Sequence, residues 1–328
     1  MTSIGDMPAT LAVQGFSVRR VEIEHPAFQE ALRRVERLHV RSQSTGQAGG
    51  LLITGLTGSG KTTVRRVYER RFPKFDDGDV SRTRVLYVDT PASPTVKNLA
   101  ESILIALGDP VSHKGTAAQK TQRIYHLLRL CGVELLIVDE FQHFFDHGKR
   151  TEAARVTDWL KGFINNAGIP VVLMGMPESE QVLRLNPQLA RRFSARFDLK
   201  PFSFETVEDA QQFRGLLAAI ERTLPLPSVS LSAPDMARRF FYATFGLIDY
   251  VCKIADGAIE LARSQGCARI DQFHLAEAFK EEVWSDVTPA LNPFSAESVL
   301  RPLTRVGEPF ANIASGVSRD QLRATSHY

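Results

Sequence analysis

The stretch Gly50-Leu-Leu-Ile-Thr-Gly-Leu-Thr-Gly-Ser-Gly-Lys-Thr-Thr63 decides how the rest of the chain is organised. The apolar run at residues 51–53 predicts a buried β-strand, and residues 55–62 match the phosphate-binding loop G-x-x-x-x-G-K-[ST]. Glycines let such a loop curl so that its N–H groups point inward, and the following helix adds its positive N-terminal end. We therefore expect a nucleotide site. Its predicted binding residues are Gly55, Thr57, Gly58, Ser59, Gly60, Lys61, Thr62 and Thr63.

Four side chains near this loop carry the expected chemistry of ATP hydrolysis. Lys61 is expected to reach the β- and γ-phosphates, and the Thr62 hydroxyl is expected to ligate Mg²⁺. Within residues 134–141, four apolar residues are followed by the adjacent acids Asp139 and Glu140. Hydrolysis needs one carboxylate to anchor Mg²⁺ and another to polarise the attacking water. Asp139 is the predicted metal residue and Glu140 the predicted general base.

Composition limits the class of protein. The chain has 328 residues, of which 43% are hydrophobic, a length that suits two domains or one α/β domain with a smaller attachment. It shows neither an apolar run near the roughly 18 residues needed to span a bilayer nor a signal peptide. The three cysteines have no paired spacing and are interpreted as reduced thiols. We expect a cytoplasmic protein without membrane contact. The net charge of +3 hints weakly at an anionic partner.

Strands and helices alternate through the first two hundred residues. Besides the strand before the loop, further strands are predicted at residues 84–89, 134–141, 169–174 and 196–204. Their alternation with helices favours an α/β fold whose parallel five-stranded sheet is covered on both faces. Between the first two strands, residues 76–81 are expected to form a surface turn.

The pattern is purely helical after residue 205, where Thr206-Val-Glu-Asp209 predicts a capping box. After Trp284 the chain carries several prolines and no long periodic segment. The predicted division is an N-terminal arm (1–24), a nucleotide-binding α/β subdomain (25–204), a small all-helical subdomain (205–285) and a proline-containing tail (286–328).

Two adjacent arginines precede the last predicted strand, in Gln188-Leu-Ala-Arg-Arg-Phe193. A guanidinium is permanently charged, so it can approach the γ-phosphate of a neighbouring subunit and stabilise developing charge. Arg192, directly before the phenylalanine, is the first candidate for such an arginine finger. Arg191 is the second candidate and Arg196 the third. The alternative is a solvated basic helix face.

The order of these motifs resembles that of AAA+ ATPases with a helical lid. Several segments resemble, more narrowly, the TniB/TnsC family of transposition helper ATPases, over roughly residues 20–285. Those segments are His25-Pro26, Gly55-Leu-Thr-Gly-Ser-Gly-Lys-Thr-Thr63, Val88-Asp-Thr-Pro91, Leu136-Ile-Val-Asp-Glu-Phe141, Gly175-Met-Pro-Glu178 and Gln188-Leu-Ala-Arg-Arg-Phe193.

The resemblance implies a P-loop AAA+ domain of the additional-strand ASCE type with a small all-helical lid, using ATP and Mg²⁺. It also implies a homo-oligomer, as a ring or helical filament, that assembles with ATP on double-stranded DNA. Membership would make the protein a link between a target-selection protein of TniQ type and a transposase.

Two positions depart from the AAA+ pattern. The fourth strand ends in Met174-Gly175-Met176, where these ATPases usually place a polar sensor 1, so Glu178 or Ser179 would have to serve. In the helical part, Asp249 stands where a sensor 2 arginine is expected, and Lys253 is a weak substitute. Both departures predict slow ATP hydrolysis.

Contact with DNA is expected from the segment between the second strand and the acidic pair. Its candidate contacts are Lys97, Lys114, Lys120 and Thr95, with Arg123 and His113 nearby. In a ring or spiral each subunit needs only a few phosphate contacts, since they multiply around the assembly. No base-reading motif is visible, so binding should be largely independent of DNA sequence. The alternative is an ordinary solvated face. We interpret the histidines within residues 142–147 as structural, not as a metal site.

Other functions fit parts of the pattern. One is another DNA-loading AAA+ ATPase, origin-recognition-like or helicase-loader-like, which an added winged-helix domain would favour. Another is a signalling P-loop NTPase that does not bind DNA, which would be expected to carry a repeat or effector domain. A membrane-linked secretion ATPase would require a spanning helix, and the sequence shows none.

Overall fold

The computed structural model describes residues 16–78, 80–146 and 150–316. The chain divides into two compact units, Pro26–Lys200 and Met1–His25 with Pro201–Tyr328. We call the first the α/β unit and the second the helical unit.

The α/β unit is built on the expected parallel sheet of five strands. In spatial order these are β4 (Val85–Asp89), β5 (Leu135–Asp139), β6 (Val171–Gly175), β1 (Gly50–Thr54) and β7 (Ala195–Asp198). All pairings are parallel, and β6 is hydrogen-bonded to both β1 and β5. The prediction of an α/β fold with a five-stranded parallel sheet is confirmed.

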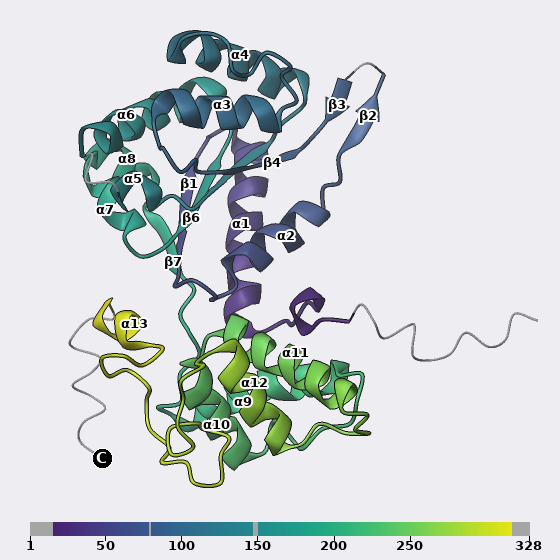
Figure 1. Cartoon of the computed structure of the whole chain (residues 1–328). Coiled ribbons are helices and arrows are strands. Elements are labelled where there is room, and N and C mark those ends of the chain that lie inside the picture. The colour runs from purple at the N-terminus through teal and green to yellow at the C-terminus, as the bar shows by residue number, and fades with distance from the viewer. Residues whose placement is uncertain (1–15, 79, 147–149, 317–328) are drawn as a thin grey trace, which may run out of the picture. The chain divides into compact units, whose positions relative to one another are not determined.

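Helices cover both faces of this sheet (Figure 1). Successive side chains of a strand point to opposite faces. In β5, Leu136 and Val138 accordingly join a core with α3 (Val96–Ala106), α4 (Ala117–Leu130) and α6 (Arg150–Ala167). Leu135 and Ile137 join the opposite core, which includes side chains from α1 (Pro26–Thr45) and α2 (Lys61–Arg70). Three shorter helices complete the unit: α5 (His143–Asp146), α7 (Ser179–Arg184) and α8 (Pro187–Arg192).

The surface turn expected at residues 76–81 is instead part of a β-hairpin. β2 (Phe75–Asp77) and β3 (Val80–Arg82) pair antiparallel and form a separate two-stranded sheet. Arg82 holds the hairpin through an ion pair with Asp77 at 3.0 Å and a bond to the Leu130 carbonyl oxygen at 2.9 Å. Strands of three residues are too short for an alternating pattern to be visible, which explains the wrong expectation.

The helical unit consists of α9 (Val207–Thr223), α10 (Pro234–Thr244), α11 (Ile248–Ser264), α12 (Gln272–Glu282), α13 (Ala311–Gly316) and the 3₁₀-helix η1 (Val18–Arg20). The expected arm and the expected tail both contribute to the core of this unit. Val18 and Ile23 come from the arm, and Phe294 and Phe310 come from the tail. The Asp256 carboxylate accepts bonds from the Ser17 hydroxyl at 2.7 Å and the Val18 N–H at 2.6 Å.

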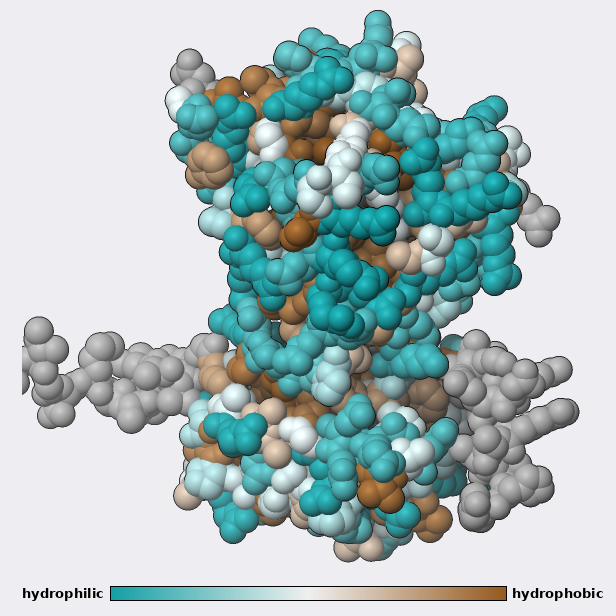
Figure 2. Space-filling view, turned by 180° about the vertical axis from the view of Figure 1, so that it is seen from behind, coloured by the Kyte–Doolittle hydropathy of each residue, from teal (hydrophilic) through white to brown (hydrophobic). Residues whose placement is uncertain are grey.

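The molecular surface of the described residues is largely hydrophilic on the face shown in Figure 2, and hydrophobic residues appear between the polar ones. No helix of the described residues is both long enough and apolar enough to cross a membrane.

We predict that Gly246→Ala destabilises the helical unit far more than Gly266→Ala does. Both glycines have left-handed φ angles, +71° and +66°, which cost an L-residue about 1–2 kcal/mol. A Cβ on Gly246 would also lie 2.0 Å from the Phe202 carbonyl oxygen, whereas nothing lies within 4 Å at Gly266. Overpacking should therefore add about 1–3 kcal/mol at Gly246. Urea unfolding followed by Trp284 fluorescence, in a Trp159→Phe background, measures the difference. Equal losses would contradict the close approach to Phe202.

Candidate functional site

The loop between β1 and α2 has the backbone of a phosphate cradle. Gly58 and Gly60 adopt left-handed φ angles of 82° and 102°, which curl the chain back on itself. Gly60 is the N-cap of α2, and no side chain caps the first N–H groups of that helix. Free N–H groups at a helix N-terminus favour a bound anion. The loop therefore fits the phosphates of a nucleotide.

Lys61 folds back onto this loop. Its Nζ donates to the carbonyl oxygens of Gly55 at 2.7 Å and Leu56 at 3.0 Å, and the residue is 7% exposed. Burial lowers the pKa of the Lys61 ammonium, while the acids Asp139, Glu140 and Asp198 oppose this shift. A desolvated cation surrounded by acids and carbonyl oxygens is ready to exchange those partners for phosphate oxygens.

The other predicted loop residues lie along the same turn. Thr57 and Thr62 are exposed, and Thr63 is partly buried. The buried hydroxyl of Ser59 has no hydrogen-bond partner among the described residues. Buried polar atoms are nearly always paired in native structures, so this oxygen is consistent with a missing ligand.

The two acids stand at the carboxyl end of β5. Asp139 is 2% exposed, and its Oδ1 accepts the Glu140 N–H at 2.8 Å. Burial raises the pKa of the Asp139 carboxyl, while the hydrogen bond from the Glu140 N–H and the charge of Lys61 oppose this shift. Glu140 has a positive φ of 54°, which is strained for a residue with a side chain and is often found at functional sites. Because the strands are parallel, these acids share the sheet edge of the phosphate loop.

Sequence reasoning missed Gln142, which is 3% exposed. Its Nε2 donates to Glu140 Oε2, and its Oε1 accepts the Met176 N–H at 3.0 Å. The one feature of the sequence that could have indicated a role for Gln142 is its position two residues after the predicted base, Glu140. The sensor 1 candidates closely follow Met176 in the sequence: Glu178 Oε2 and Ser179 Oγ are buried and have no hydrogen-bond partner in the described structure.

The candidate arginine fingers differ in their partners. Arg192 donates to Asn165 Oδ1 on α6. Arg196 pairs with Glu180 at 3.3 Å and bonds the Phe193 carbonyl oxygen. Arg191 is exposed, and its guanidinium has no ion pair or hydrogen bond with the described residues. Arg191 is thus better placed than Arg192 to meet a neighbouring subunit. In the helical unit, the sensor 2 position Asp249 pairs with Lys253 at 3.0 Å and with Arg19 at 3.2 Å.

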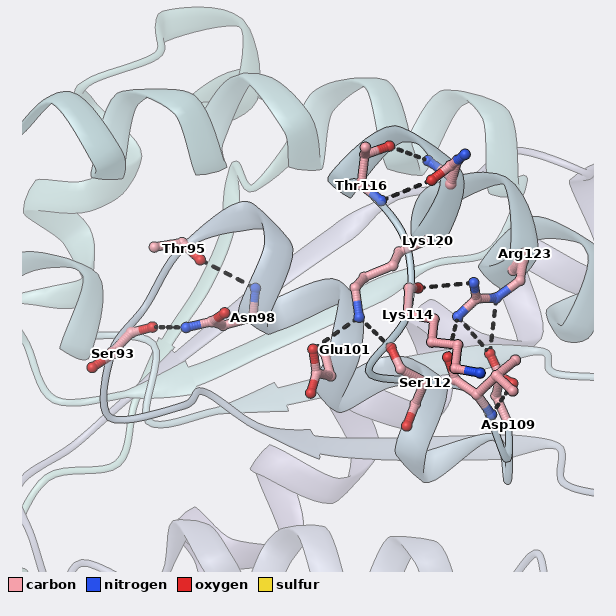
Figure 3. A network of polar contacts seen from close by, with 12 residues as sticks. Ser93, Thr95, Asn98, Glu101, Asp109, Ser112, Lys114, Thr116, Lys120 and Arg123 are labelled. Atoms are coloured by element: carbon pink, nitrogen blue, oxygen red, sulfur yellow. Dashed lines mark hydrogen bonds and ion pairs between the residues drawn. The ribbon is translucent and has the colours of Figure 1, made fainter.

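One of the expected DNA contacts was wrong. Lys120 is fully buried, pairs with Glu101 at 2.8 Å and donates to the Ser112 carbonyl oxygen (Figure 3). The physical reason is helical spacing: Lys120, Ile124 and Leu128 lie four residues apart on the buried face of α4. Lys120 therefore holds α4 to α3 and cannot contact phosphates in this structure.

The other residues of this cation segment have mixed roles. Lys97 and Lys114 are exposed, as the prediction requires. Thr95 caps α3 by accepting the Asn98 N–H at 3.1 Å, and its side chain is partly occupied by that task. Arg123 pairs with Asp109 at 2.9 Å and bonds two loop carbonyl oxygens (Figure 3).

Within the described residues, no group of three or more His, Cys, Asp or Glu side chains is arranged to hold a metal ion. The histidine-containing segment 142–147 includes residue 147, which lies outside the described residues.

Comparison with known proteins agrees with this geometry. The family model "Bacterial TniB protein" matches residues 18–203. General secretion pathway protein A of Aeromonas hydrophila is 28% identical over 228 residues, which are 68% of this chain; the chain spans 38% of that relative's length.

Three solved structures share the fold. The Aeropyrum pernix ORC1 protein in complex with DNA has a TM-score of 0.58 at 20% identity, covering 79% of this chain and 66% of that one. The CDC6P structure from Pyrobaculum aerophilum has a TM-score of 0.62 at 14% identity, covering 83% and 71%. Domain III of the replication initiation protein DnaA from Thermotoga maritima has a TM-score of 0.51 at 16% identity, covering 81% and 96%. At these identities the likeness shows the fold alone, which is that of AAA+ P-loop ATPases.

We predict that Lys61→Ala lowers affinity for a fluorescent ATP analogue by about 100-fold or more, because two charge-assisted contacts to phosphate would be lost. Lys74→Ala, which removes an exposed lysine outside the loop, serves as the control and should bind normally. An unchanged affinity in Lys61→Ala would remove the phosphate-loop assignment.

Proposed function

This chain belongs to the bacterial TniB protein family, and we propose that it is an ATP-dependent, DNA-binding regulator of DNA transposition. It would oligomerise on target DNA in the cytoplasm and link a target-selection protein of TniQ type to the transposase. The observation that carries the proposal is that the phosphate loop, the acidic pair and the basic helix α8 all lie within the matched segment.

The nucleotide chemistry is assigned to four side chains of the α/β unit. Lys61 binds the phosphates, and the Thr62 hydroxyl with the Asp139 carboxylate would hold Mg²⁺. Bound there, the metal would supply positive charge beside the phosphates. Glu140 accepts a proton from the attacking water. Strand β6 ends without a polar sensor 1 residue, and Asp249 stands where a sensor 2 arginine is expected. We therefore expect ATP hydrolysis to be slow.

The proposed assembly completes each site with a cation from the next subunit. Arg191 is the better candidate, because it is exposed and its guanidinium is unpaired among the described residues. Arg192 would first have to leave Asn165. Both arginines end α8, so a ring or a helical filament that brings α8 to a neighbour's phosphate loop would satisfy the requirement.

The proposed DNA surface is smaller than the sequence implied. Lys97 and Lys114 are its exposed cations, Thr95 lies two residues before Lys97, and Lys120 is excluded by burial. Two cations per subunit hold a duplex weakly, because each phosphate contact contributes little at moderate salt. Strong binding then depends on neighbouring subunits aligned by ATP.

A second candidate is a DNA-loading ATPase of origin-recognition type, which the shared fold with the ORC1 and CDC6P structures favours. The two functions differ in partner: a loader delivers a helicase, whereas a transposition regulator delivers a transposase. Co-purification on DNA with a helicase would favour the loader, and co-purification with a transposase would favour the transposition regulator.

We predict that the Lys97→Glu, Lys114→Glu double variant still binds ATP but loses duplex DNA on every sequence alike, as expected for phosphate contacts. Wild-type protein with ATP should bind two unrelated duplexes with similar affinity that falls steeply as salt rises. A mobility-shift titration with and without ATP measures this. The matched control is Arg222→Glu, Lys280→Glu, with the same change of charge on exposed residues of the helical unit. A wild type that ignores duplex DNA under every nucleotide condition would instead favour a signalling NTPase.

We predict that Arg191 acts in trans. Arg191→Ala should suppress ATP turnover, and mixing it with Lys61→Ala subunits should restore part of it, because one composite site stays intact. Arg192→Ala is mixed with Lys61→Ala subunits in the same way. Arg184→Ala, which also removes an exposed arginine, is the control and should keep normal turnover. If neither mixture regains turnover, the finger lies elsewhere or the sites are not shared.

A further inference from the structure

Gln142 lies between the predicted base and the end of β6, at the place where AAA+ ATPases usually put a polar strand residue. We propose that Gln142 is a positioning residue: it holds the Glu140 carboxylate for water attack and replaces the polar residue that β6 lacks. The inference rests on the proposed ATPase function and concerns how that site works.

The network fixes which way the amide points. The Met176 N–H can only donate, so the atom 3.0 Å from it must be the Gln142 carbonyl oxygen. The NH₂ group is then turned toward Glu140 and donates to its Oε2. Gln142 thus connects the carboxylate to the backbone just beyond β6, with an orientation set by the protein.

Gln142 is packed closely against the end of β6. The Phe141 N–H donates to the Met174 carbonyl oxygen at 3.0 Å, which ties this segment to β6. A Cβ on Gly175 would lie 2.6 Å from Gln142 Oε1 and 2.3 Å from Ser179 Oγ. The end of β6 therefore has no room for a side chain of its own, because the Gln142 amide and the Ser179 hydroxyl occupy that space.

The contact also explains how Glu140 keeps a left-handed backbone. Strained conformations persist where several contacts fix them, and here the Asp139 carboxylate holds the Glu140 N–H while Gln142 holds its side chain. Hydrogen bonds from the described residues engage one carboxylate oxygen, Oε2. The other oxygen is left to accept a proton from water.

The test compares Gln142→Leu, which keeps the volume and removes both hydrogen bonds, with wild type and with Glu140→Gln. We expect Gln142→Leu to leave affinity for an ATP analogue within about twofold and to lower the single-turnover rate by about 10–100-fold, as misplacement of a reacting group does. In the Glu140→Gln background, Gln142→Leu should lower the rate no further, because the group it positions is already gone. Thr157→Val, which removes a buried hydroxyl bonded within α6, is the control and should leave the rate unchanged.

A readout independent of activity is hydrogen exchange at the Met176 amide of the nucleotide-free protein. It should become faster in Gln142→Leu and stay unchanged in Thr157→Val, with both variants folded by circular dichroism. An unchanged or raised rate in Gln142→Leu, an equal loss in the Glu140→Gln background, or unchanged exchange at Met176 would overturn the positioning role. A wild type that does not hydrolyse ATP would overturn the proposed function itself, which is a separate result.

Discussion

The parallel pairing of β5, β6 and β1 is the constraint on which the site depends. Thr54 is in register with Gly175, and the Gly55 N–H continues the ladder by donating to the Gly175 carbonyl oxygen at 3.1 Å. Because all three strands run the same way, everything that follows them emerges at one edge of the sheet. The phosphate loop after β1, the acids at the end of β5 and the glycine that ends β6 are therefore brought together by the strand pairing alone.

The strands could be predicted because buried parallel strands are continuous apolar runs, and the loop because its glycines and lysine have fixed spacing. The burial of Lys120 was also visible in principle, since it stands four residues before Ile124 on one helix face. The role of Gln142 could not be predicted, because its partner Met176 is 34 residues away. The choice between Arg191 and Arg192 likewise depends on Asn165, which only the tertiary packing of α6 against α8 brings near.

The basic segment between β4 and β5 divides its charge between two tasks. Lys120 and Arg123 hold the loop between α3 and α4 in place through Glu101 and Asp109. Lys97 and Lys114 remain on the surface. Counting cations in a sequence therefore overstates the charge that a partner can meet, since a buried cation is neutralised by its own ion pair.

The tight fit at Gly175 has an evolutionary consequence. A side chain at position 175 would meet both the Gln142 amide and the Ser179 hydroxyl, so Gly175 cannot change alone without displacing them. In relatives, a polar residue at the end of β6 should accompany changes at positions 142 and 179 that make room for it, and a glycine should accompany the glutamine. These positions would then be inherited together. The arrangement in this chain and the conventional AAA+ arrangement would be alternative solutions that single substitutions do not easily interconvert.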